Sequence, residues 1–253
     1  MMQETVRLKP LLWRTLCLLA LGMLGLQLFF FLRVLAMRAI DPGSTAFQRS
    51  QIHQLSQQQF PPQWRQQWVD LPLISLNLQK AVLAAEDSAF FEHDGIYWES
   101  IEKAWDKNQR SLARAQRQNS RATKMPKIVG GSTITQQLAK NLFLSGERSY
   151  VRKAQEFLIT LYMEALLDKH RILEIYLNHV EWGSGVFGAQ AAAQRYFAMH
   201  PRGLGRQEAS RLSVMLPRPR HHERMPQSAY LNRQTEVISN RIDQVGIPPR
   251  TQR

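Results

Sequence analysis

The first strong pattern along the chain is an unbroken apolar run near its N-terminus. From Thr15 to Leu32 there is no charged residue over 18 positions, close to the roughly 20 residues that a helix needs to cross the hydrocarbon core of a bilayer. A cleaved signal peptide is the alternative, because Val34-Leu35-Ala36 loosely fits a cleavage site. Signal peptides have shorter apolar cores of about 7–15 residues, so the pattern favours an uncleaved transmembrane helix.

The chain then turns polar before a helical pattern returns. Residues 38–70 are rich in glutamine and interrupted by proline and glycine, which predicts a linker that settles onto the domain or the membrane. Apolar residues recur at helical spacing from Leu78 to Ala89, and Gln136 to Leu142 continues a second helix after a Gly-Gly break. We expect a mainly helical globular part that begins near Leu71.

The longest amphipathic pattern lies in the second half of the chain and predicts one long helix from about Tyr150 to Asn178. The stretch Gly183-Ser184-Gly185 is its expected stop, and the small residues from Gly188 to Ala193 predict a tightly packed helix. The apolar stripe of the long helix comprises Leu158, Leu161, Tyr162, Ala165, Leu166, Ile172, Ile175 and Tyr176.

Length and cysteine content set outer limits. A chain of 253 residues accommodates a membrane segment and one globular domain of ordinary size, which excludes a second large catalytic domain. The single cysteine, Cys17, lies in the apolar run, so an intrachain disulfide is excluded and cysteine usage does not indicate the compartment.

A formal net charge of +13 and a pI near 10.4 indicate an anionic partner: nucleic acid, an anionic lipid surface or a phosphate-bearing substrate. The segment 103–127 is the most cationic, with Asp106 as its single acid. We interpret it as a mobile loop beside an anionic substrate, and a plain solvated loop is the alternative. Its cations are Lys103, Lys107, Arg110, Arg114, Arg117, Arg121, Lys124 and Lys127.

Candidate chemistry begins at the end of the first predicted helix. Glu86 follows four apolar residues, so partial burial could raise its pKa and make it a usable proton acceptor near neutral pH. Asp87 is expected to make local hydrogen bonds, and a capping or ion-pairing role for both acids is the alternative. His93 follows two phenylalanines and is expected to be structural rather than a base or a metal ligand.

A second constellation runs from Gly130 to Asn141. Thr133 and Gln136 have capping-box spacing, and a helix N-terminus offers free N–H groups and a positive dipole to a phosphate or a polar sugar. Lys140 lies one turn beyond Gln136 on the same face. The segment lacks the spacing of a nucleotide P-loop, so a bare helix cap is an equally good interpretation.

A third constellation places cations before a carboxylate. Arg152 and Glu156 are spaced i, i+4, as in a simple surface ion pair. That pair leaves Arg148 and Lys153 without local acid partners, whereas a diphosphate leaving group would need such cations. From the residues alone, a surface ion pair and a diphosphate-binding cation group are equally good interpretations.

Taken together, these segments resemble the glycosyltransferase family 51 domain of class A penicillin-binding proteins and monofunctional peptidoglycan glycosyltransferases. The resemblance covers about Leu78 to Phe197 in five ordered motifs. They read E-D-x-x-F-x-x-H-x-G at 86–95, G-G-S-T-I-T-Q-Q at 130–137, R-K-x-x-E at 152–156, I-L-E-x-Y-L-N at 172–178 and G-x-x-G-A-x-x-A-A-x-x-Y-F at 185–197. With no room for a transpeptidase domain after Phe197, the match is to the monofunctional membrane form.

The resemblance implies a lysozyme-like, two-lobed, mainly α domain over 71–253, preceded by a cytoplasmic N-terminus (1–14), an anchor (15–37) and a linker (38–70). It implies that Glu86 is the general base and Glu156 a second catalytic carboxylate, and leaves Glu174 and Tyr176 to architecture. The residues that it implies for substrate binding are Asp87, Ser132, Thr133, Gln136, Gln137, Lys140, Asn141, Arg148, Arg152 and Lys153.

The resemblance also implies a substrate and a place. Glu86 would activate the GlcNAc 4-hydroxyl of lipid II, which attacks the lipid-diphosphate-linked growing chain with inversion, forms a β-1,4 bond and releases undecaprenyl diphosphate. The expected partners are lipid II, the lipid-linked glycan, the membrane and other cell-wall synthesis proteins, without nucleic acid. A divalent cation, Mg²⁺ or Mn²⁺, is a candidate bridge for the diphosphate, without a protein-held metal or organic cofactor. The domain would lie in the periplasm, anchored in the inner membrane.

Two alternatives from other classes remain. A peptidoglycan-cleaving glycosidase would need a carboxylic acid that protonates a glycosidic oxygen and need not bind diphosphate. The cations between Lys140 and Lys153 argue against it. A non-enzymatic basic membrane protein that binds nucleic acid or anionic lipid is supported only by net charge and the segment 103–127.

Overall fold

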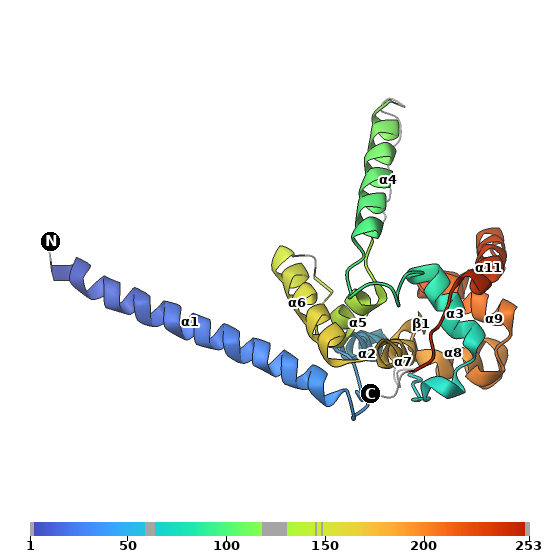
Figure 1. The fold of residues 1–253 in the computed structure, drawn as a ribbon, viewed down its shortest axis with the longest axis horizontal. Coiled ribbons are helices and arrows are strands. Elements are labelled where there is room, and N and C mark those ends of the chain that lie inside the picture. The colour runs from blue at the N-terminus through green and yellow to red at the C-terminus, as the bar shows by residue number, and fades with distance from the viewer. Residues whose placement is uncertain (1–2, 59–63, 118–130, 145, 148, 251–253) are drawn as a thin grey trace.

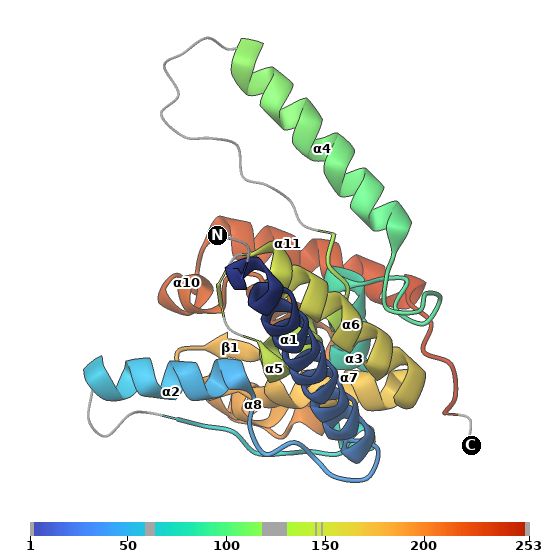
Figure 2. The same cartoon turned by 90° about the vertical axis from the view of Figure 1, so that its left-hand side faces the viewer.

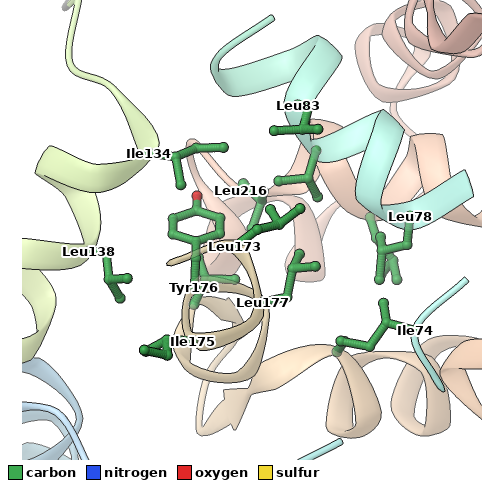
Figure 3. Packing of buried hydrophobic residues seen from close by; sticks show 14 of the residues in the cluster. Ile74, Leu78, Leu83, Ile134, Leu138, Leu173, Ile175, Tyr176, Leu177 and Leu216 are labelled. Atoms are coloured by element: carbon green, nitrogen blue, oxygen red, sulfur yellow. The ribbon is translucent and has the colours of Figure 1, made fainter. Parts of the chain in front are cut away.

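Helix α7 (Lys169–His179) forms the centre of the domain, because every residue from Arg171 to His179 is buried. We describe a computed structural model over residues 3–58, 64–117, 131–144, 146–147 and 149–250. Figure 3 shows the apolar side chains of α7 between those of two other helices, α5 (Ile134–Phe143) and α3 (Leu76–Glu86). The two helices that carry or adjoin most of the predicted site residues are therefore packed on one buried helix.

The described residues are mainly helical, as predicted. The sheet within them has two antiparallel strands, and Arg65 extends it by a parallel bridge to Val186. The predicted stop at 183–185 lies at this hairpin. The remaining elements of the domain are β1 (Glu181–Gly183), β2 (Val186–Phe187), α8 (Gly188–Phe197), α9 (Arg206–Met215), α10 (Pro219–Arg224), α11 (Ala229–Arg241) and the 3-10 helices η1 (Leu71–Leu73), η2 (Pro201–Gly203) and η3 (Ile242–Gln244).

The N-terminal apolar run forms a single long helix, α1 (Gln3–Ala36). Its stretch Pro10–Ala36 has 27 residues and a mean hydropathy of 2.2, long and apolar enough to cross a membrane. Figure 1 shows α1 extending far beyond the domain, with only its C-terminal part against other helices. The helix fits a single-pass membrane anchor.

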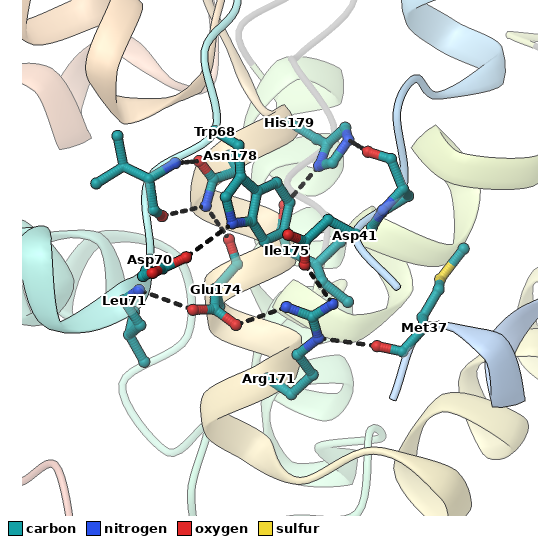
Figure 4. A network of polar contacts seen from close by, with 12 residues as sticks. Met37, Asp41, Trp68, Asp70, Leu71, Arg171, Glu174, Ile175, Asn178 and His179 are labelled. Atoms are coloured by element: carbon teal, nitrogen blue, oxygen red, sulfur yellow. Dashed lines mark hydrogen bonds and ion pairs between the residues drawn. The ribbon is translucent and has the colours of Figure 1, made fainter. Parts of the chain in front are cut away.

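A buried polar network fixes the chain where it leaves the anchor (Figure 4). The Arg171 guanidinium donates to the Met37 carbonyl at 2.8 Å and pairs with Asp41 at 2.6 Å and Glu174 at 2.7 Å. His179 contacts the Pro42 carbonyl at 2.9 Å. Buried polar groups are strongly destabilising unless they are hydrogen-bonded, so these contacts hold the segment after the anchor firmly on α7.

The same helix fixes the segment that leads into α3. The Asn178 side chain accepts a hydrogen bond from the Val69 N–H and donates one to the Val69 carbonyl, both at 2.8 Å. Glu174 accepts one from the Leu71 N–H at 2.7 Å. Within the predicted linker 38–70 the structure also has a helix, α2 (Ala46–Gln58), which packs against α5.

The prediction of one continuous helix from Tyr150 to Asn178 is wrong. Helix α6 (Tyr150–Leu166) ends at an extended Leu167, and α7 starts anew after Asp168. The Asp168 carboxylate accepts a hydrogen bond from the Arg171 N–H at 2.7 Å, which is the contact of an N-cap. The apolar stripe continues across the break between α6 and α7, so the periodicity of apolar residues could not reveal the break.

The prediction of a loop over 103–127 is also wrong where the structure describes it. Helix α4 (Trp98–Arg117) includes residues 103–117, and it stands away from the domain in Figures 1 and 2. Trp98, Ile101 and Trp105 recur at helical spacing, and Lys103 pairs with Glu99 one turn away at 2.8 Å. The remaining cations of that segment, at 121, 124 and 127, lie outside the described residues.

The Asn178 contacts give a test of the central packing. Asn178→Ala leaves the buried N–H and carbonyl of Val69 without partners, which should lower the free energy of unfolding by about 2–4 kcal/mol. Thermal unfolding of the detergent-solubilised chain measures this loss. Asn77→Ala is the matched control, because Asn77 makes one long hydrogen bond of 3.4 Å, and an equal loss in both variants would contradict the assignment.

Candidate active site

Glu86 is the last residue of α3, and its side chain is partly buried. Burial raises its pKa, and the neighbouring Asp87 charge raises it further, while a hydrogen bond from Gln137 and the charge of Lys140 oppose the rise. Desolvation disfavours the charged form of a carboxyl group, so Glu86 is a stronger proton acceptor than an ordinary glutamate. This is the property that its position in the sequence predicted.

The orientation of Glu86 depends on two further side chains. The Gln137 amide N–H donates to Glu86 Oε2 at 2.8 Å, and the Tyr176 hydroxyl donates to the other end of that amide, Gln137 Oε1, at 3.1 Å. Tyr176 is buried in α7, and burial raises its pKa well above the usual value, so it remains a donor. From the sequence, Tyr176 was expected to be structural. Its hydrogen bond to Gln137 was missed, because only the packing of α5 on α7 creates it.

Asp87 joins three separate segments behind Glu86. Its Oδ1 accepts from His93 Nε2 at 2.9 Å, and its Oδ2 accepts from the Ile134 N–H at 3.0 Å. The Gly95 N–H donates to His93 Nδ1 at 3.1 Å. His93 is thus a satisfied structural residue, as predicted, whereas the predicted contact of the buried Asp87 with substrate stays a prediction.

The capping box expected at the start of α5 is present. The Thr133 hydroxyl accepts from the Gln136 N–H, and the Gln136 side chain accepts from the Thr133 N–H. Thr133 also donates to the Gly95 carbonyl at 2.7 Å. Both side chains are buried and engaged within the protein, so the geometry favours a structural role for Gln136, and its sugar contact stays a prediction.

Gly95 permits this close approach. Its φ is +81°, and a Cβ there would lie 2.7 Å from side-chain atoms of Thr160 and Glu164 on α6. Only glycine adopts such a φ freely and leaves that space open. The glycine that ends the first motif therefore lets its loop fit between the start of α5 and the flank of α6.

The second predicted carboxylate, Glu156, is buried on α6. Its Oε2 accepts from Arg152 Nη1 at 2.7 Å and its Oε1 from Lys153 Nζ. Lys153 also reaches Ser132 Oγ at 3.5 Å, so the motif on α6 touches the motif before α5. Glu156 is fully paired, in contrast to Glu86.

Lys140 connects the two carboxylates electrostatically. Loss of solvation around its ammonium lowers the pKa of Lys140, Arg152 and Lys153 lower it further, and Glu156 and Glu86 raise it. Both carboxylates therefore act on the same ammonium. The structure brings together a weakly paired carboxylate and a cluster of three cations, which we name the cation cluster: Lys140, Arg152 and Lys153.

A pocket of about 140 Å³ opens directly at Glu86. Tyr97, which the sequence did not single out, faces it and stacks on His93 with ring centroids 5.6 Å apart. The lining residues are Ala84, Ala85, Glu86, Asp87, Ser88, Tyr97, Gly131, Ser132 and Thr133. A larger pocket of about 220 Å³ at the β1–β2 hairpin involves none of the predicted site residues.

For two predicted binding residues, Asn141 and Arg148, the structure gives no contact that bears on substrate binding. Asn141 follows Lys140 on α5 and is half-buried, and Arg148 lies outside the described residues. The donor set does not fit a metal held by the protein, because both Glu156 oxygens are paired with cations. Across the described part of the chain, no group of three or more His, Cys, Asp or Glu side chains could hold a metal ion.

The sequence profile of the transglycosylase family matches residues 51–243, a range that contains every residue of this site. The chain belongs to the transglycosylase family. It is therefore a glycosyl-transferring enzyme, and the site built from α3, α5 and α6 lies within its transglycosylase domain.

Curated relatives cover nearly the whole chain. It is 46% identical over 242 residues to a biosynthetic peptidoglycan transglycosylase of Janthinobacterium sp. (strain Marseille), covering 95% of this chain and 99% of that protein. It is 46% identical over 240 residues to one from Herminiimonas arsenicoxydans, covering 95% and 98%. A Burkholderia multivorans transglycosylase of the same name is 44% identical over 229 residues, covering 90% and 88%.

The hydrogen bond to Glu86 sets a pH dependence that can be measured. Because the Gln137 contact lowers the pKa of Glu86, Gln137→Leu should raise that pKa further. A base acts in its deprotonated form, so the acid limb of the pH–rate profile should move to higher pH in this variant. Gln194→Leu, an exposed position on α8, is the control, and an acid limb that stays in place in Gln137→Leu would contradict the coupling.

Proposed function

We propose that this transglycosylase polymerises the glycan strands of peptidoglycan. The GlcNAc 4-hydroxyl of lipid II attacks the anomeric carbon of the lipid-diphosphate-linked growing chain, forms a β-1,4 bond with inversion, and releases undecaprenyl diphosphate. The names of the relatives, biosynthetic peptidoglycan transglycosylases, support peptidoglycan as the polymer. The observation that carries the mechanism is that Glu86, whose pKa is raised, lies in the same site as the cation cluster.

Glu86 supplies the proton acceptor. Its carboxylate takes the proton of the attacking hydroxyl as the new C–O bond forms, while the bond to the diphosphate breaks. Gln137 donates to one carboxylate oxygen, which leaves the other oxygen to face the hydroxyl. General base catalysis typically contributes about 10²–10⁴-fold, and the rest of the acceleration must come from positioning and from stabilisation of charge.

The cation cluster stabilises the leaving diphosphate. Negative charge grows on the diphosphate as the glycosidic bond breaks, and fixed cations in a partly desolvated site lower the energy of that state. Glu156 holds Arg152 and Lys153 in place rather than taking part in proton transfer. Any divalent cation here would take its ligands mainly from the diphosphate oxygens, since Glu156 is already paired.

The anchor supports a membrane-bound substrate. Helix α1 suits a single span, and we propose that residues 1–14 lie in the cytoplasm and the catalytic domain on the periplasmic face of the inner membrane. A diphosphate lipid embedded in the same membrane then reaches the site without leaving the bilayer. Contacts with other cell-wall synthesis proteins stay a prediction.

The decisive experiment is polymerisation of labelled lipid II by the full chain in detergent or vesicles, with products resolved by length. Glu86→Gln keeps the size of the side chain and removes the base, so we expect a loss of about 100-fold or more. Glu236→Gln, on the exposed face of α11, is the matched control and should keep full activity.

The outcomes separate the candidate functions. Long strands from the wild type and none from a folded Glu86→Gln variant support the polymerase and the base. A wild type that makes no strands but cleaves finished peptidoglycan would move the assignment to a glycosidase, in which Glu86 with its raised pKa would act as the acid.

Lys140 tests the electrostatic part of the mechanism. Because its pKa is lowered, its charge is lost at a lower pH than that of an ordinary lysine, and the alkaline limb of the rate profile should follow it. Lys140→Arg, whose charge persists, should move that limb to higher pH, whereas Lys140→Met should lower kcat by roughly tenfold or more at pH values below that limb, where the wild-type ammonium is charged. Equal profiles for wild type and Lys140→Arg would show that Lys140 does not set the limb.

A further inference from the structure

A polar residue lies inside the apolar run of the anchor and faces the domain. Gln27 stands about five residues, or roughly 8 Å at the rise of an α-helix, before the end of the uncharged stretch 15–32. It is half-buried, and Phe30 and Val34, spaced to share its face of α1, are buried, as is Met37 just after the helix. The exposed apolar residues on α1 before Gln27 show that the helix leaves the domain at this point.

Both ends of the Gln27 side-chain amide are hydrogen-bonded to α6. Its amide N–H donates to Gln155 Oε1 at 2.9 Å, and the Gln155 amide N–H donates back to Gln27 Oε1 at 3.2 Å. The Tyr162 hydroxyl donates to the same Gln27 oxygen at 3.3 Å. We name this set of three side chains the amide clamp. In hydrocarbon there is no water to replace such bonds, and polar residues inside a membrane segment commonly mark function.

Aromatic contacts join the anchor to two of the helices that carry the site, α5 and α6. Phe31 packs edge-on against Tyr162 of α6, with ring centroids 5.8 Å apart. Phe30 packs edge-on against Phe143 at the end of α5, with centroids 5.5 Å apart. The anchor therefore touches the helix of Gln137 and Lys140 as well as the helix of Arg152, Lys153 and Glu156.

The clamp is directly linked to the catalytic groups. Gln155 immediately precedes Glu156, and the two side chains lie on different faces of α6, one toward the anchor and one toward the site. We propose that the amide clamp fixes α6 against the anchor and so holds Glu156 and the cation cluster at the membrane depth of the lipid-linked diphosphate. Gln27, Gln155 and Tyr162 are positioning residues in this proposal, which rests on the proposed function.

The test uses the full chain in phospholipid vesicles. Gln27→Leu and Gln155→Leu each leave a partner amide unpaired, while Leu28→Ala, on the exposed face of α1, is the control. We expect each glutamine variant to lower kcat for polymerisation by roughly tenfold with the KM for lipid II within about twofold, because misplacement of catalytic groups affects rate most. The double variant should be no slower than the slower single variant, since both singles break one pair.

A second readout does not depend on activity. Cysteines introduced by Phe30→Cys and Phe143→Cys, in a Cys17→Ser background, report the contact between anchor and α5 through a short thiol cross-linker. Loss of the clamp should lower the cross-linking yield several-fold, because apolar contacts alone hold helices together weakly in lipid. Unchanged yield in Gln27→Leu, or kinetic effects that multiply in the double variant, would overturn the clamp. A wild type that cross-links but does not polymerise would refute the proposed function and leave the clamp standing.

Discussion

The structure depends on one constraint: α7 carries charged and polar side chains through the centre of the domain and must satisfy all of them there. Arg171, Glu174 and Asn178 do so by binding chain segments that are distant in sequence. The partners are the exit of the anchor and the entry to α3. A network that satisfies buried groups in this way also specifies which segments lie next to one another. The position of Glu86 at the end of α3 follows from it.

The two glutamates of the site differ because their surroundings differ. Glu86 ends a helix, is partly buried and receives one neutral hydrogen bond, whereas Glu156 is buried between two cations. Two carboxyl groups in such different environments can take different chemical roles. One side chain remains available for protons, and the other organises positive charge. Lys140 lies within the electrostatic reach of both carboxylates.

The sequence predicted the anchor, the mainly helical class and the local features of the site, because each depends on residues close together in the chain. The capping box of Thr133 and Gln136 and the hydrogen bond between His93 and Asp87 are examples, whereas the bond from the Ile134 N–H to Asp87 is not local. It failed where a single side chain outweighed the periodicity, as at Asp168, and where basic residues concealed the apolar positions of α4. The Tyr176–Gln137–Glu86 chain joins three helices, so no local pattern could reveal it. The role of Arg148 stays a prediction outside the described residues.

The attachment of residues 37–42 to α7 has a mechanical consequence. A catalytic domain on a loose tether would sample many heights above the bilayer, and its reach would grow with the length of the tether. Here the chain passes from the anchor to the buried helix without slack, since Met37, Asp41 and Pro42 are all bound to it. Under the proposed function, the bilayer therefore sets the height of the active site, and a growing polymer would have to slide past a stationary site.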